Sequence, residues 1–144
     1  GRGSAEVTSD LLQLSAELDV TDRVQWVGWH PDVANWMHSA DVFVHSAADE
    51  AHPLTLMESL AAGLPLVATA AGGSREGVQP YYEMVPTRDP TALADRVELV
   101  LGDLAEQRSY AESIRFQAAA RFDPMRMAEA HLSACRAVLR RRGS

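Results

Sequence analysis

The sequence predicts an α/β fold in which helices alternate with the short strands of a parallel sheet. Two apolar stretches, 41–45 and 65–69, have the length and composition of buried strands. A helical segment separates them, with Pro53 at its start and Gly63 and Pro65 at its end. Ligands of such folds bind beyond the carboxyl ends of the strands. The stretch from 45 to 53 is therefore the first place to expect a site.

The elements before residue 40 are short. A helix over 5–18 precedes a turn at Thr21-Asp22 and a strand over 24–28 that a glycine closes. Asp32 then begins a helix that ends near Ser39.

The elements after residue 76 are mostly helical. Residues 83–85 are expected to form a short edge strand. Asp-Pro pairs at 89–90 and 123–124 begin helices, and Gly102-Asp103 separates two of them. The side chains expected to face inward are Val33, Trp36, Met37, Leu93, Val97, Val100 and Leu101, and Cys135 is expected to be a small core residue.

The sheet has an unusual beginning. A doubly wound domain normally opens with a strand, whereas this sequence opens on a helix, and three or four short strands are few for 144 residues. We therefore expect a single domain over 1–144 that lacks one or two N-terminal strands. An incomplete sheet edge predicts self-association.

Composition narrows the function classes. The net charge is −7, and residues 1–60 carry ten acidic residues and two arginines, which opposes nucleic-acid binding. No apolar run approaches the roughly 20 residues that span a bilayer, so we expect no transmembrane segment. Absence of a basic-then-apolar start and a lone cysteine favour a cytoplasmic protein. The absence of lysine and the abundance of Arg and Ala suggest a bacterial source with a GC-rich genome.

Two carboxylates stand out beside the predicted helix start. Glu50 lies in the loop before the helix, and Glu58 lies about one and a half turns into it. Carboxylates accept paired hydrogen bonds from vicinal sugar hydroxyls, and free N–H groups around 54–56 suit a phosphate. Together they describe a sugar-nucleotide site, although two glutamates at this spacing also fit a pair of solvated charges.

The order of the motifs resembles a known family. The chain is similar to the donor-binding half of the GT-B glycosyltransferases, and most of all to the retaining family called family 4 or group 1. The matching segments are VQWVG at 24–28, ADVFV at 40–44, EAHPL at 50–54, ESLAAGLPLVAT at 58–69, GGSRE at 72–76, DPTALA at 89–94 and ARFD at 120–123.

The resemblance implies a three-layer Rossmann-like half of a GT-B fold with C-terminal helices, and transfer of a hexose from a nucleotide sugar with retention. It implies neither a metal nor a cofactor. Glu50 matches the glutamate that contacts the donor sugar near the reacting carbon, and Glu58 matches the one that holds the ribose. The amides near Pro53, Leu54 and Thr55 match the diphosphate-side helix start, and Ala51 and His52 beside them are expected to be substrate-binding as well. The nucleobase side is expected at Trp29 and His30.

Several positions depart from the family pattern. Ala51 replaces a glycine, so its methyl group could crowd a phosphate or sugar. His45 stands where proline is common, either as a site group or as a hydrogen-bonded structural residue. His52 could cap the helix or meet a phosphate, and Trp29 could stack on a base or pack internally.

The family's diphosphate-binding Arg and Lys segment and its N-terminal acceptor domain have no counterpart in the chain. A leaving diphosphate needs cations to stabilise its charge, so the chain alone is expected to be inactive. Two alternatives remain open. One is a non-catalytic sugar-nucleotide or partner-binding module, and the other is part of a nucleotide-sugar epimerase. The parent protein is expected in the cytoplasm, with peripheral membrane association left open.

Overall fold

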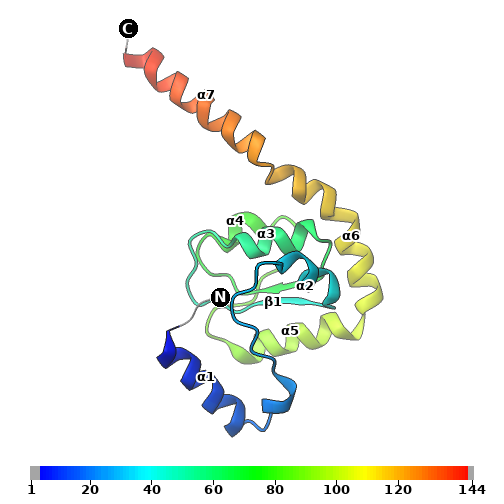
Figure 1. Ribbon diagram of the computed structural model, residues 1–144. Helices are drawn as coiled ribbons and strands as arrows, with labels where there is room; N and C mark the ends of the chain where they lie inside the picture. Colours follow the sequence, from blue (N-terminus) through cyan, green and yellow to red (C-terminus); the bar gives the residue numbers. More distant parts are fainter. Residues whose placement is uncertain (1–3, 143–144) are drawn as a thin grey trace. The chain divides into compact units, whose positions relative to one another are not determined.

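The computed structural model describes residues 4–142, which fall into two compact units, one ending at Val33 and one beginning at Ala34 (Figure 1). The first unit holds α1 (Ala5–Glu17) and a short 3-10 helix, η1 (Thr21–Arg23). The other elements are, in order, α2 (Val33–Ser39), β1 (Phe43–His45), α3 (Leu54–Ala61), β2 (Leu66–Ala68), α4 (Ser74–Val78), α5 (Pro90–Gly102), α6 (Leu104–Arg121) and α7 (Pro124–Arg142).

The first unit contains the predicted helix but not the predicted strand. The Ser4 hydroxyl accepts a hydrogen bond from the Val7 N–H at 3.2 Å and so caps α1. Residues 24–28 form no strand, which corrects the prediction, although Val24 itself has an extended backbone. A strand is defined by its place in a sheet, and the sheet within residues 4–142 consists of β1 and β2.

The sheet of the second unit is parallel and narrower than predicted. β1 and β2 pair in the register Phe43 with Leu66, Val44 with Val67 and His45 with Ala68. The expected edge strand over 83–85 is reduced to a single parallel bridge between Thr69 and Val85. Helices alternating with a parallel sheet confirm the predicted fold class, but each strand has three residues instead of five.

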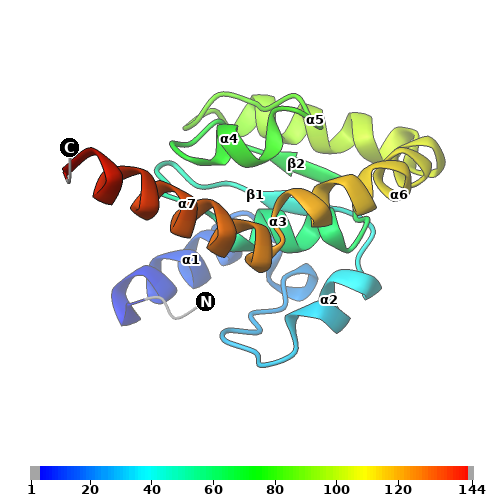
Figure 2. The same cartoon turned by 90° about the horizontal axis from the view of Figure 1, so that it is seen from above.

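Helices cover both faces of the sheet, with α3 and α4 above the strands and α5 below them in Figure 1. All three residues of β2 are buried for this reason, as an interior parallel strand requires. α6 packs along α3 (Figure 2). The buried cluster consists of Leu56, Leu60, Leu66, Ala68, Val78, Tyr82 and Ala118.

The exposed fractions confirm the inward position predicted for some side chains and correct it for the others. Met37 and Val100 are buried, and Leu93 and Val97 are half-buried. The predictions for Val33, Trp36, Leu101 and Cys135 are wrong, because all four lie exposed. Helical spacing marks which residues share a face, but it does not say whether another element covers that face. In α7, every side chain from 124 to 140 is exposed.

Within the part of the chain that the structure describes, no helix combines the length and the hydropathy that crossing a membrane requires.

Candidate functional site

Residues 46–53, here called the acidic loop, connect the carboxyl end of β1 to the start of α3. β1 and β2 are parallel, so both strands end at the same edge of the sheet as this loop. Glu50 lies within the loop, and its side chain is 32% exposed. The loop therefore presents a partly accessible carboxylate where ligands of parallel α/β folds bind.

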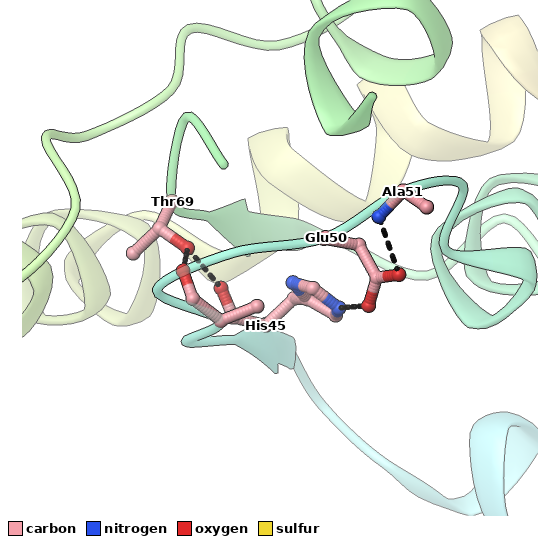
Figure 3. A network of polar contacts seen from close by, with 5 residues as sticks. His45, Glu50, Ala51 and Thr69 are labelled. Atoms are coloured by element: carbon pink, nitrogen blue, oxygen red, sulfur yellow. Dashed lines mark hydrogen bonds and ion pairs between the residues drawn. The ribbon is translucent and has the colours of Figure 1, made fainter. Parts of the chain in front are cut away.

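The carboxylate of Glu50 is held from two sides (Figure 3). Its Oε1 accepts a hydrogen bond from the Ala51 N–H at 3.0 Å, and its Oε2 lies 3.8 Å from Nε2 of His45. An ionised carboxylate offers about four lone-pair sites, so these two contacts leave acceptor capacity for a ligand hydroxyl. The His45 side chain is only 13% exposed and lies against this carboxylate. His45 thus belongs to the site as a neighbour of Glu50.

The backbone of the acidic loop is tied to the residues that follow β2. The Thr69 hydroxyl donates to the Ala47 carbonyl oxygen at 2.6 Å and lies 3.3 Å from the His45 carbonyl oxygen (Figure 3). The Gly73 N–H donates to the Glu50 carbonyl oxygen at 2.9 Å. Sequence reasoning did not find these ties. The threonine had no signal of its own, and the Gly72-Gly73 pair indicated only a turn.

The start of α3 differs in detail from the prediction. Pro53 is buried and precedes the helix as its N-cap instead of lying in the first turn. The Leu56 N–H donates to the Pro53 carbonyl oxygen at 3.1 Å, so the expectation that it is free for a phosphate is wrong. As the first two helical residues, Leu54 and Thr55 have no intrahelical acceptor for their N–H groups.

The other predicted site residues are accessible. Glu58 is exposed on α3, between the buried Leu56 and Leu60 in the chain. Ala51 and His52 are exposed in the acidic loop. Within the described residues, no hydrogen bond links Glu50 to Glu58, so each carboxylate would contact a ligand independently of the other.

Trp29 and His30 lie in the first unit and are exposed. The nucleobase role of these two residues stays a prediction.

Burial raises the pKa of Tyr82, a residue of the core, well above its ordinary value. Across residues 4–142, no three His, Cys, Asp or Glu side chains are grouped so that they could hold a metal ion. The chemistry that the described loop offers is hydrogen-bond acceptance by carboxylates next to helix N–H donors.

Comparison with known proteins connects this geometry to a family. A family model described as glycosyl transferases group 1 matches residues 3–116. The chain belongs to this family. Among curated relatives, it is 31% identical over 114 residues to the lipopolysaccharide core biosynthesis glycosyltransferase LpsE of Rhizobium meliloti (strain 1021). That match covers 76% of the chain and 33% of the relative.

Solved structures share the fold of this chain. The sucrose-phosphate synthase of Thermosynechococcus elongatus superposes with a TM-score of 0.83 at 27% identity, covering 96% of this chain and 36% of that one. HepE of Anabaena, solved in complex with UDP-glucose, has the same fold, with a TM-score of 0.82 at 24% identity over 91% of this chain and 38% of that one. The chain spans about a third of the length of these proteins.

Proposed function

We propose that this chain is the donor-binding part of a retaining hexosyltransferase. The parent protein would transfer a hexose from a nucleotide sugar to an acceptor with retention at the anomeric carbon. Glu50 would contact the donor sugar near the reacting carbon, and Glu58 would bind the ribose hydroxyls. The N–H groups of Leu54 and Thr55, with Ala51, His52 and Pro53 around them, would face the diphosphate.

One observation carries the proposal: the partly exposed carboxylate of Glu50 is held in the loop that leads into α3, at the edge where β1 and β2 end. A sugar ring offers hydroxyls to a carboxylate, and a diphosphate accepts N–H donors at a helix start. The membership of the chain in the group 1 glycosyltransferases supports the assignment of such a ligand. A simple anion bound at this helix start would gain nothing from the nearby carboxylate of Glu50, whereas a sugar with hydroxyl groups would.

The donor assignment is tested by titrating the chain with UDP-, GDP- and ADP-sugars by calorimetry. Glu58→Gln removes the charge at constant shape, and Glu98→Gln on α5 is the matched control, because Glu98 is also an exposed helical glutamate. Hydrogen bonds to charged groups contribute roughly 1.5–3 kcal/mol, so we expect about a tenfold to hundredfold loss for Glu58→Gln only.

A second titration isolates the ribose. A 2′,3′-dideoxy analogue of the donor that binds lacks the hydroxyls assigned to Glu58. Affinity for this analogue should be weak in the original chain and unchanged in Glu58→Gln, since the interacting hydroxyls are already gone. If Glu58→Gln weakens the analogue as much as the full donor, Glu58 does not bind the ribose.

The reaction itself needs more than this chain. We propose that residues 1–144 alone do not turn over a donor, because the acceptor side and the cations for the leaving diphosphate lie in other parts of the parent protein. Donor hydrolysis or transfer by the purified chain would contradict this. We also propose a cytoplasmic location for the parent.

A further inference from the structure

The turn at Gly72-Gly73 lies against the backbone of the acidic loop. A Cβ atom added at Gly72 would lie 2.1 Å from the Glu50 carbonyl oxygen, and one added at Gly73 would lie 1.8 Å from the Ala51 carbonyl oxygen. Real Cβ atoms essentially never approach another heavy atom within 3.0 Å. Both obstacles are main-chain atoms, so no side-chain rotation relieves them.

The two glycines are needed for different reasons. Gly72 has a φ of +40°, in the left-handed region that favours glycine, so its backbone conformation alone accounts for its identity. Gly73 has a φ of −67° and a ψ of −8°, an ordinary right-handed conformation that any residue adopts. At Gly73 the only requirement for glycine is therefore space, and the space is filled by the acidic loop.

The contact also includes a direct bond. The Gly73 N–H donates to the Glu50 carbonyl oxygen at 2.9 Å, while Thr69 binds the loop near its beginning through the Ala47 carbonyl oxygen. The acidic loop is thus held at its start by the end of β2 and at Glu50 by the glycine turn. The side chain of Glu50 projects from the residue whose carbonyl the turn fixes.

We infer that Gly73, together with Gly72, is a positioning residue for Glu50: the side-chain-free turn lets the acidic loop approach and sets where the Glu50 carboxylate stands. The inference rests on the proposed contact between Glu50 and the donor sugar. The competing explanation is that the glycines only form a tight turn from β2 into α4. That explanation requires glycine at Gly72 but gives no reason for it at Gly73.

The decisive variant is Gly73→Ala, with two Gly→Ala controls in the same chain. A Cβ at Gly102 meets nothing within 4 Å, and one at Gly77 meets only the Phe122 ring edge at 3.8 Å and the Met57 methyl at 3.9 Å. Amide chemical shifts and hydrogen exchange measured by NMR report the loop. In Gly73→Ala we expect the Glu50 and Ala51 amides to shift and the residue 73 amide to lose its exchange protection, and in both controls we expect neither.

Binding separates positioning from general damage. The probes are UDP-glucose and UDP, or the corresponding pair for whichever base the chain accepts. Because Glu50 is assigned to the sugar, Gly73→Ala should weaken the nucleotide sugar by roughly tenfold, the worth of a hydrogen bond to a charged group, and leave the free nucleotide within about twofold. Equal weakening of both probes would mean that the glycine has a structural role only and would overturn the inference.

The outcomes distinguish this inference from the proposed function. If the loop amides keep their shifts in a folded Gly73→Ala chain, the inference fails whatever the chain binds. If the loop amides shift while sugar affinity is unchanged, the turn positions the loop but the role of Glu50 in donor binding is wrong. If Gly73→Ala does not fold, exchange in the original chain decides. A Gly73 amide that exchanges as fast as an unstructured one would refute the contact, and a protected one supports it.

Discussion

The α3–β2 core and the final helix α7 are built from the same kinds of apolar residue and bury them to opposite extents. Leu60 in α3 and Leu66 in β2 are each 1% exposed, whereas Leu132 and Leu139 in α7 are 56% and 68% exposed. α3 meets β2, α4 and α6, and these contacts cover its apolar side. The difference teaches that hydrophobic periodicity predicts which face of a helix is apolar. It does not predict how deeply that face is buried, because burial depends on the elements packed around the helix.

The largest expected effect on stability comes from truncating a side chain of the core. Leu60→Ala should lower the free energy of unfolding by about 2–5 kcal/mol, because it removes buried methyl groups and leaves a cavity. Leu139→Ala makes the same chemical change on α7 and should stay within about 0.5 kcal/mol. Urea unfolding of both variants measures the contrast, and equal losses would mean that α7 is buried in the folded chain.

An intermediate effect is expected from the two Asp-Pro helix starts. The Asp89 carboxylate accepts from the Ala92 N–H at 2.9 Å at the start of α5, and the Asp123 carboxylate accepts from the Met125 N–H at 2.9 Å at the start of α7. Asp89→Ala should lower the free energy of unfolding by about 0.5–2 kcal/mol, since α5 packs on β2.

Asp123→Ala is the matched change at α7. It should reduce helicity by circular dichroism while leaving the urea midpoint nearly unchanged, because α7 contributes no buried side chain from 124 to 140. A shift of the midpoint equal to that of Asp89→Ala would show that folding of the core depends on α7.

A small effect on stability at neutral pH is expected for one change inside the core itself. The Tyr82 hydroxyl is buried without a hydrogen-bond partner among the described residues. The Tyr82 ring packs edge-on against the Tyr110 ring, with 5.4 Å between the two ring centroids. Tyr82→Phe keeps the ring and should change stability by less than about 1 kcal/mol near pH 7.

The same variant should differ from the original chain in alkali. Burial raises the pKa of Tyr82 in the folded chain, whereas the unfolded chain releases this proton near the ordinary pKa of 10.0. Above about pH 10 the folded chain therefore holds more protons than the unfolded one, and stability falls as pH rises. Tyr82→Phe should make this fall shallower in thermal melts between pH 9 and pH 11. Parallel curves for both proteins would contradict the assignment.

Local signals in the sequence predicted most of the helices and their limits. Asp89 and Asp123 each cap the start of a helix, and a proline follows each of them, as the sequence predicts. Gly63, with a φ of +70°, follows the end of α3. The strand expected over 24–28 was wrong, and the strand over 83–85 shrank to one bridge, because pairing depends on residues far away in the chain.

The candidate site likewise has parts that the sequence predicts and parts that it does not. Glu50 and Glu58 could be named from their spacing around a helix start and from the family resemblance. The contacts of Thr69 with Ala47 and of Gly73 with Glu50 could not, because they exist only once β1 and β2 lie side by side. The sequence alone allows His45 to be either a site group or a structural residue, and the 3.8 Å between its Nε2 and Oε2 of Glu50 places it beside that carboxylate.

The ties of the acidic loop have a consequence for the order in which the chain acquires its structure. The hydroxyl of Thr69 reaches back 22 residues to Ala47 and 24 residues to His45. During synthesis, Glu50 therefore emerges well before the residues that hold its backbone. Such non-local contacts form late, after the loop-closure entropy of the intervening helix has been overcome. The Glu50 carboxylate is thus fixed in place only when α3 has docked and β2 has paired with β1, so the proposed donor site would form only after this unit has folded.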